Sequence, residues 1–546
     1  MTMAIIQVES PMLRGDGDRL TLTEAIELAN GENTEAAHRC PRAIQGDPDT
    51  DEEIEIRLIC GEEELVFPDC GATLSCVLPP LCSGKRVVID GQGKCLRGGG
   101  TGCGLILSSG GVTVRRLTLS HFSAGIFITQ AERSIDGVAI EKCRFEEMTH
   151  ACILGGMTGS DLTLSHVAIR ECDMQAPSRA RKKGACTAVL LSAVLDWTGG
   201  VFVSGVSMRE LFVNGNVIHA HPDGGTFSEG INIFTTCDYT YGVGRAVGSG
   251  SNSRIADCTT ENVFIEQNEV SGVDDSCIGF LGALPARERC SIRNFHICRN
   301  RVSYFLTGLC VSSCNQYAGG ESYHCSASDL YMEDNILLPS EETPDEPSMA
   351  VALINVRAES GEIVCEDCTL ERVAVRGNRI EGRDWGIVLE GMHGTQDLPA
   401  PSRLCRCGIR SVTIEHNEIR GVREPLRMFG VRLEGRVDRF WDYGLVEVND
   451  RYPYSVYAQG NFVDQVTVRN NEVSDYDCFL NMAGAWAAGR GFARENSVGP
   501  GLVFENNLLD KGKKVFAYRY EAADQRLLEE ACGSGNRAWK ESIFIS

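Results

Sequence analysis

Two adjacent carboxylates, Asp274 and Asp275, stand directly before an apolar run in Val273-Asp274-Asp275-Ser276-Cys277-Ile278. Carboxyl groups can donate a proton, activate water or attack a reacting carbon. The alternative interpretation is structural, because Asp is common at the bend before a strand. Asp384 and Asp477 precede similar runs and support that alternative. Both interpretations stay open.

A second candidate lies in the segment from Gly421 to Gln465, which is rich in aromatic and arginine residues. Aromatic faces stack on sugar rings, and arginines pair with carboxylates or phosphates. The same composition suits a protein–protein interface or a loop folded onto its own coil. The candidate substrate-binding residues are Arg439, Trp441, Tyr443 and Tyr454.

The chain has 25 cysteines, a high and odd number. Cys365-x-x-Cys368 with Cys405-x-Cys407 could in principle bind zinc, as could the group Cys310, Cys314, His324 and Cys325. Close pairs are expected by chance in a chain this rich in Cys, and many of its cysteines fall inside strand-like runs, where a thiol acts as a small apolar group. We therefore predict mostly reduced core thiols, with several disulfides as the alternative. We predict no metal site and no cofactor.

One repeat must position these residues. Alternating apolar residues, two polar residues, Asn and another apolar position recur, as in Val263-Phe264-Ile265-Glu266-Gln267-Asn268-Glu269-Val270. The alternation predicts a strand. Asn tolerates a left-handed backbone, and its amide can hydrogen-bond the same amide one coil away. The repeat position is occupied in turn by Leu117, Cys143, Cys172, Asn216, Asn268, Asn300, Asn335, Asn378, Asn417, Asn471 and Asn507.

A second strand follows the repeat position by six to ten residues, as in Ala124–Ile128, Ala151–Leu154, Ser276–Phe280 and Trp385–Leu389. It forms the other half of each coil. The copies are 26 to 54 residues apart, so the excess leaves the coil as lateral loops. The fold expected is an all-β, single-stranded right-handed parallel β-helix, a solenoid with short N- and C-terminal capping helices and long lateral loops.

The ends of such a coil need covers, because an open end exposes unpaired backbone and apolar core. Thr21-Leu22-Thr23-Glu24 is a capping box that begins a short amphipathic helix ending at Gly31. Glu521 to Ala531 predicts a second short helix. We expect one domain, with an N-terminal cap and first coils over 1–86, the β-helix over 87–510 and a C-terminal cap over 511–546.

The formal net charge is −23, with 43% hydrophobic residues. An acidic surface repels nucleic acid and anionic lipid, so we expect no nucleic-acid partner. No run of about 18 apolar residues predicts membrane insertion, and the first ten residues lack the features of a signal peptide. The localisation expected is intracellular, virion-associated or reached by a non-Sec route.

The repeats and the N-terminal segment, with Val87-Val88-Ile89-Asp90-Gly91, resemble the pectin-lyase-like superfamily of right-handed parallel β-helices, from about Leu20 to Leu509. The Asp274-Asp275 motif resembles that of polygalacturonase-type glycosidases. In that resemblance an acid one coil earlier completes the set, and Glu229 matches it. Parallel strands lie about 4.8 Å apart, so Glu229 could face one aspartate, and the nearby charge would raise one pKa, as a general acid requires.

This sequence departs from the glycosidase pattern in three places. Ser276 is inserted before Cys277, Thr307-Gly308-Leu309 stands where the family has a catalytic His between glycines, and the downstream Arg-x-Lys motif is missing.

Two functions follow as hypotheses. The first is a carbohydrate-binding or carbohydrate-processing β-helix, possibly a glycoside hydrolase acting on an extended polysaccharide or glycan through groove carboxylates; a polysaccharide lyase is the less favoured enzyme, because no specific basic residue stands out. The second is a non-catalytic structural or adhesive β-helix of a surface, spike or virion coat, which predicts a homo-oligomer or glycan binding without turnover.

Overall fold

The computed structural model describes residues 2–15, 17–182, 184–197, 199–238, 253–281, 287–316, 320–344, 347–358, 363–395, 402–434, 456–487, 491–494, 496–498, 501–518 and 537–538. The chain divides into two compact units. Unit 1 comprises Met1–Leu195, Val206–Asn232 and Val263–Val273. Unit 2 comprises Asp196–Gly205, Ile233–Asn262 and Asp274–Ser546.

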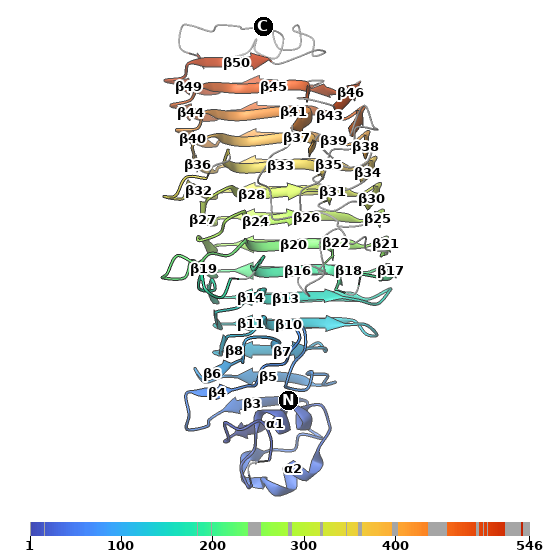
Figure 1. Cartoon of the computed structure of the whole chain (residues 1–546), viewed down its shortest axis with the longest axis vertical. Helices are drawn as coiled ribbons and strands as arrows, with labels where there is room; N and C mark the ends of the chain where they lie inside the picture. Colours follow the sequence, from blue (N-terminus) through green and yellow to red (C-terminus); the bar gives the residue numbers. More distant parts are fainter. Residues whose placement is uncertain are drawn as a thin grey trace. The chain divides into compact units, whose positions relative to one another are not determined.

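Each unit is a parallel β-helix, as the sequence predicted, because successive strands of one coil belong to different sheets and pair with the matching strands of the next coil (Figure 1). Sheet 1 contains the strand before each repeat position, sheet 2 the short strand after it, and sheet 3 the apolar second strand. Unit 2 adds a fourth sheet. The second strand is therefore not the whole other half of a coil, since sheets 2 and 4 also contribute.

In unit 1 the order in sheet 1 is β2 (Ile44–Gln45), β1 (Met3–Val8), β3 (Glu53–Leu58), β5 (Arg86–Asp90), β8 (Val112–Arg115), β11 (Ile135–Glu141), β14 (Thr163–Arg170) and β18 (Ser207–Asn214). Sheet 2 contains β4 (Glu64–Val66), β6 (Cys95–Arg97), β9 (Thr118–Ser120), β12 (Arg144–Glu146), β15 (Asp173–Gln175), β19 (Val217–His219) and β23 (Glu269–Val270). Sheet 3 contains β7 (Cys103–Leu107), β10 (Ala124–Gln130), β13 (Ala151–Met157) and β16 (Thr187–Asp196). Strands β20 (Glu229–Asp238) and β22 (Thr259–Glu266) contain residues of both units.

In unit 2, sheet 1 contains β26 (Ser291–Cys298), β31 (Ser326–Glu333), β35 (Thr369–Arg376), β39 (Gly408–Glu415), β43 (Phe462–Arg469), β47 (Ser497–Val498) and β48 (Val503–Glu505). Sheet 2 contains β27 (Arg301–Tyr304), β32 (Ile336–Pro339), β36 (Arg379–Glu381), β40 (Glu418–Arg420), β44 (Glu472–Ser474), β49 (Leu508–Asp510) and β51 (Arg537–Ala538).

Sheet 3 of unit 2 contains β24 (Ser276–Leu281), β28 (Thr307–Ser312), β33 (Met349–Ala358), β37 (Trp385–Thr395), β41 (Glu424–Glu434), β45 (Cys478–Ala487) and β50 (Lys514–Tyr518), with β29 (Cys314–Gln316) beside β33. Sheet 4 contains β17 (Phe202–Ser204), β21 (Arg254–Ala256), β25 (Arg287–Glu288), β30 (Gly320–Tyr323), β34 (Ile363–Glu366), β38 (Ser402–Cys405), β42 (Val456–Gln459) and β46 (Gly491–Arg494).

The predicted asparagine ladder is confirmed within each unit. The Asn378 side-chain nitrogen donates to the Asn417 side-chain oxygen at 3.0 Å, and that oxygen also accepts from the Asn378 backbone nitrogen at 3.0 Å. Asn216 and Asn268 are joined in the same way in unit 1. These asparagines are buried, so the ladder satisfies amides that would otherwise lose their hydrogen bonds to water.

The left-handed backbone was assigned to the wrong residue. The residue before the ladder position adopts positive φ, for example Gln267 at 56° and His416 at 57°, whereas the ladder asparagine does not. The preceding residue makes the turn, and this leaves the asparagine side chain free to point along the ladder.

A second ladder, which the sequence analysis missed, lies at the bend between sheets 4 and 1 of unit 2. Five thiols occupy the position taken by asparagine in the first ladder, and each donates to the carbonyl two residues earlier, as Cys407 does to Cys405 at 3.3 Å. The column continues with asparagines, since Asn461 Oδ1 accepts from the Cys407 backbone nitrogen at 2.9 Å. Its members are Cys258, Cys290, Cys325, Cys368, Cys407, Asn461 and Asn496.

The N-terminal cap is confirmed. Helix α1 (Leu22–Ala29) begins at Thr21 with both capping-box hydrogen bonds, and its buried face packs on β1 and β3. Helix α2 (Thr34–Arg39) and a single turn, η1 (Pro41–Ala43), follow. The predicted C-terminal helix, Glu521 to Ala531, lies outside the described residues.

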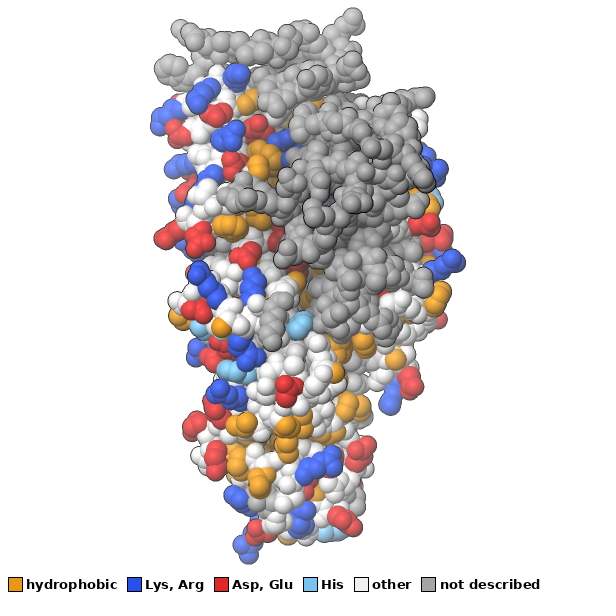
Figure 2. Space-filling view, in the orientation of Figure 1, with side chains coloured by type: hydrophobic (Ala, Val, Ile, Leu, Met, Phe, Trp, Pro, Cys, Tyr) orange, Lys and Arg blue, Asp and Glu red, His pale blue; other side chains and the backbone are white. Residues whose placement is uncertain are grey.

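The outer faces of the sheets carry charges of both signs. Figure 2 shows acidic and basic side chains interspersed along the edge over β36, β40 and β44. On sheet 1 of unit 2 they form a continuous row, in which Arg376 contacts Glu333 at 3.2 Å and Glu415 at 2.6 Å, and Arg469 contacts Glu415 at 2.5 Å. Among the described residues there is no helix of the length and apolarity that a membrane crossing needs.

Candidate functional site

Asp275 lies in the bend that leads into β24 of unit 2, where its carbonyl accepts a hydrogen bond from the Thr307 backbone nitrogen at 2.9 Å. Its side chain is only 6% exposed, while that of Asp274 is half-buried. Among the described residues, the carboxyl of Asp275 receives one side-chain hydrogen bond, a long one from Ser276 Oγ at 3.5 Å.

Burial raises the pKa of the Asp275 carboxyl above its usual value. The guanidinium of Arg357 and the hydroxyl of Ser276 oppose this rise in pKa, whereas the neighbouring carboxylate of Asp274 adds to it. A buried carboxyl of this kind keeps its proton to a higher pH than a solvated one, and a general acid needs that property.

The equivalent aspartates show what a turn residue at this bend looks like. Asp384 also accepts a backbone hydrogen bond from the next coil, from Glu424 at 2.8 Å, which confirms the equivalence. Its carboxylate accepts from the Ser348 backbone nitrogen at 3.1 Å and from the Ser348 hydroxyl at 3.2 Å. Asp477 pairs with Lys513 at 2.7 Å. The bend is common to the three aspartates, but only at Asp275 is the carboxyl buried with so little hydrogen bonding.

Glu229 begins β20 and belongs to unit 1. It is half-buried, and its carboxylate accepts a hydrogen bond from Thr187 Oγ1 at 3.0 Å. The structure therefore brings Asp274 and Asp275 together in one bend, while Glu229 belongs to the other compact unit.

The predicted substrate-binding residues Arg439, Trp441, Tyr443 and Tyr454 lie outside the described residues. They stay predictions.

A second cluster lies on sheet 3 of unit 2, at the paired strands β37 and β41. Glu390 is completely buried there, with Arg432 Nη1 at 3.1 Å, His393 Nδ1 at 2.9 Å and Arg427 Nε at 4.0 Å from its carboxylate oxygens. Burial alone would raise the pKa of Glu390, but Arg432, His393 and Arg427 outweigh it and hold that pKa well below its usual range. This carboxylate is ionised at any physiological pH.

A carboxylate beside a surface histidine raises the pKa of the imidazole, but the pKa of His393 is lowered. Burial is the largest influence and lowers the pKa of His393, with Arg432 and Arg357 acting in the same direction, although Glu390 opposes them. The ring is therefore neutral near pH 7, and its Nδ1 lies 2.9 Å from the Glu390 carboxylate.

Trp385 supports the two arginines of this cluster. The guanidinium of Arg427 lies 4.1 Å from the Trp385 ring centroid and 4.4 Å from that of Phe429, and that of Arg432 lies 4.6 Å from the Trp385 centroid. Stacking fixes the planes of the guanidinium groups, which is how proteins present arginine to carboxylate, sulfate or phosphate groups.

Sequence analysis missed this cluster because it joins residues of β37 to residues of β41 that are 34 or more positions further along the chain, and these meet only through strand register, which pairs Val388 with Arg427 and His393 with Arg432. One signal was present: Glu390 follows the apolar run Ile387-Val388-Leu389, where a charge needs a partner.

No group of three or more His, Cys, Asp or Glu side chains within the described ranges is arranged to hold a metal ion. Cys365, Cys368 and Cys407 are buried, whereas Cys405 is partly exposed.

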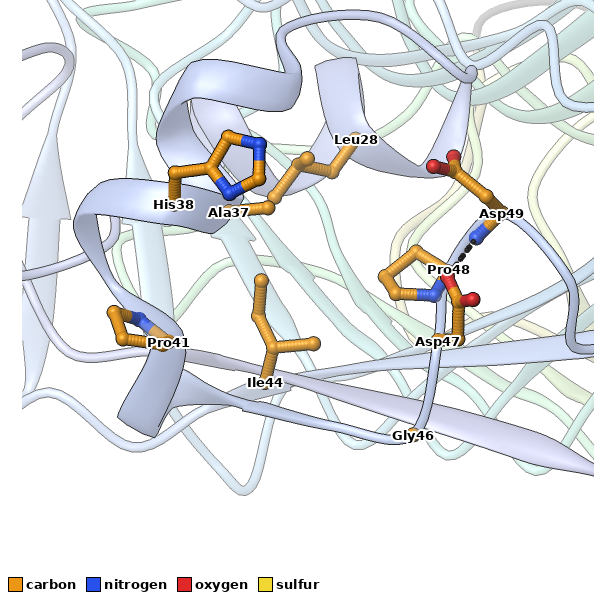
Figure 3. A pocket seen from close by; sticks show the side chains of 9 residues that line it. All are labelled: Leu28, Ala37, His38, Pro41, Ile44, Gly46, Asp47, Pro48 and Asp49. Atoms are coloured by element: carbon orange, nitrogen blue, oxygen red, sulfur yellow. Dashed lines mark hydrogen bonds between the residues drawn. The ribbon is translucent and has the colours of Figure 1, made fainter.

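A pocket of about 330 Å³ lies at the N-terminal cap of unit 1, between α1, α2 and the turn after β2 (Figure 3). Its lining is mainly apolar, from Leu28, Ala37, Pro41, Ile44 and Pro48. The backbone nitrogen of Asp49 donates to the Asp47 carboxylate at 2.9 Å, which holds the turn at its rim. This pocket shares no residue with the Asp275 bend or with the Glu390 cluster.

The architecture defines the chain as a parallel β-helix protein. No protein-family model matches the sequence, and no curated protein matches it. Among solved structures it is similar to the A-module of the mannuronan C-5 epimerase AlgE6 from Azotobacter vinelandii, with a TM-score of 0.32 and 11% identity over 94% of this chain and 96% of that one. A similarity this weak assigns no substrate or reaction to the chain.

Proposed function

We propose that this protein is a carbohydrate-processing β-helix that hydrolyses a glycosidic bond in an extended polysaccharide, with Asp275 as its general acid. The observation that carries the proposal is the difference between Asp275 and its equivalents, because burial raises the pKa of Asp275 while Asp384 and Asp477 are held by hydrogen bonds and ion pairs. A glycosidase needs one carboxyl that is still protonated when the substrate binds.

The remaining roles follow from this assignment. Asp274, half-buried in the same bend, is the candidate base or nucleophile, and Glu229 is the candidate third carboxylate. Arg439, Trp441, Tyr443 and Tyr454 are the candidates for sugar contacts.

The test is a screen of the purified protein against plant, algal and microbial polysaccharides for the release of reducing sugar. Asp275→Asn is expected to lower kcat by a factor of about 100 or more, because it removes the proton donor. Asp384→Asn is the matched control, since Asp384 occupies the equivalent bend before β37, three strands further along sheet 3 than β24, and it should leave kcat within about twofold. Full activity of Asp275→Asn would overturn the assignment.

A second candidate function, a non-catalytic structural or adhesive β-helix, is favoured by the outer face of sheet 1 in unit 2. Its charges are reciprocally paired along Glu333, Arg376, Glu415 and Arg469. A face of that kind needs no ligand to be stable. This candidate predicts self-association, or glycan binding in which Asp275→Asn changes neither affinity nor product.

A further inference from the structure

The interior of unit 2 contains a buried arginine, Arg287, on the short strand β25. Its register partners in sheet 4 are Ile255 and Ser322, both buried, so the side chain points into the coil. Arg287 is 3% exposed, and none of its three guanidinium nitrogens has a hydrogen-bond partner among the described residues. A buried cation is costly unless an opposite charge lies beside it.

The groups that surround Arg287 are thiols. The side chains whose charge raises the pKa of Arg287 against the effect of burial are the thiols of Cys290, Cys325, Cys314 and Cys237, all of which are buried. The described residues around Arg287 offer no carboxylate among these influences. Of these groups, a thiolate is the form that would neutralise the cation.

Cys290 and Cys314 are the two of these thiols whose pKa is lowered, and Cys314 is singled out by its close contact with a second thiol. Its Sγ lies 3.2 Å from Cys365 Sγ, and hydrogen bonds from Cys365, Cys368 and Ser322 stabilise its ionised form. These contacts, together with the charge of Arg287, lower the pKa of Cys314, although burial opposes this. The pKa of Cys365 is raised, because its thiol donates the hydrogen bond to Cys314 and must keep its proton to do so.

We propose that Cys314 carries a thiolate paired with Arg287, and that Cys314 and Cys365 form a dithiol that hydrogen peroxide converts to a disulfide. The Cys314 thiolate attacks one oxygen of the peroxide, the O–O bond breaks, and hydroxide leaves and is protonated to water. Cys365 then attacks the sulfenic sulfur, an S–S bond forms, and a second water leaves. Two thiols are oxidised and one peroxide is reduced to two waters. The oxidant has to be small, because the whole cluster is buried.

The thiolate is tested by its ultraviolet absorbance in the native protein, which needs no access for a reagent. At pH 7 the wild type is expected to show the absorbance of roughly one thiolate more than Cys314→Ser. Arg287→Met removes the cation and should abolish the difference, whereas Arg287→Lys keeps the charge and should retain it. Circular dichroism checks that each variant is folded. No difference between the wild type and Cys314→Ser would overturn the proposal.

The dithiol is tested with hydrogen peroxide, followed by alkylation and mass spectrometry. A Cys314–Cys365 linked peptide should form in the wild type and in Arg287→Lys, and several-fold more slowly in Arg287→Met. The matched control is the pair Cys143 and Cys172 in unit 1, whose thiols are buried and hydrogen-bonded to each other, with a backbone hydrogen bond to Arg170 but no guanidinium charge among the main influences on either thiol. Linkage of that control pair at the same rate would show that arginine plays no part and would contradict the proposal.

Discussion

The side chains that distinguish this β-helix are charged groups buried on or inside its sheets. Glu390 is the clearest case, because its carboxylate is fully buried and is held between Arg432, Arg427 and His393. Ion pairs of this kind are strongly coupled: removing Glu390 leaves Arg432 as a buried charge without that carboxylate, and leaves Arg427 with the carboxylate of Glu424 at 3.4 Å. The cluster therefore makes two predictions about single residues.

Glu390→Gln is expected to destabilise the protein by about 3–5 kcal/mol, since the neutral amide cannot compensate two buried guanidinium groups. Urea unfolding followed by circular dichroism measures the loss. Glu381→Gln is the control, because Glu381 pairs with Arg379 at the surface of sheet 2, and an exposed ion pair contributes about 0–1 kcal/mol. Equal losses in the two variants would contradict the interpretation.

His393 gives the protein a pH dependence with a definite sign. Its pKa is lowered in the folded state, so the unfolded chain binds the proton more tightly. Stability should therefore fall as the pH drops below the unfolded value of about 6.5. His393→Gln removes that contribution, and its free energy of unfolding should depend less on pH between about 7 and 5 than that of the wild type. Parallel curves for the two proteins would exclude this role.

At the scale of elements, two ladders hold the coils in register. The side chain of Asn378 contacts the asparagines on both neighbouring coils, and its nitrogen also donates to the Met332 carbonyl at 2.8 Å. Cysteine occupies the same position at a bend of unit 2, where the Cys407 thiol donates to the Cys405 carbonyl at 3.3 Å and to the Cys365 carbonyl at 3.6 Å but has no amide with which to join a side-chain ladder. The two residues therefore stabilise the same kind of turn, and asparagine does so with more hydrogen bonds than cysteine.

Asn378→Ala should destabilise the protein by about 3 kcal/mol or more, because several buried hydrogen-bonding groups lose their partner at about 1–3 kcal/mol each. Cys407→Asn is the companion change. Asn461 Oδ1 already accepts from the Cys407 backbone nitrogen, so the new amide can join the ladder and should cost less than about 1 kcal/mol or stabilise the fold. Thermal unfolding measures both, and a large loss in Cys407→Asn would show that the two ladders are not equivalent.

At the scale of the whole molecule, the cysteines act as core residues rather than as cross-links. The 24 described cysteines are all thiols, and nineteen of them are buried. Small extracellular domains need disulfides for stability because their apolar cores are small. The stacked coils of a solenoid bury a continuous apolar core, so here the thiols can stabilise the fold by packing alone.

The unfolding midpoint of protein purified under reducing conditions should therefore be the same with and without dithiothreitol. Rapid labelling by a charged thiol reagent should reach Cys82 first, because it is the exposed cysteine among those described, and the buried thiols only after unfolding. A midpoint that falls by several degrees in reductant would show that structural disulfides form.

The local pattern of the sequence determined the coil. Alternation such as Val263-Phe264-Ile265 specifies one buried and one exposed face, and the asparagine that follows places the turn, so strand, bend and ladder could all be predicted from single repeats. The N-terminal cap could be predicted for the same reason, since the capping box of Thr21 and Glu24 is complete within four residues. Sheet 4 was missed because its strands are only two to four residues long, too short to show a repeat of their own.

Only the tertiary structure separated Asp275 from Asp384. Each stands three residues before an isoleucine at the start of an apolar strand, but the pKa of a carboxyl depends on burial and on neighbours from other coils, such as Arg357 and Ser348. The same holds for Glu390 with Arg432, and for Arg287 with Cys314. Their contacts depend on how many residues each coil inserts before the next, and that alignment of distant residues exists only once the coils have stacked.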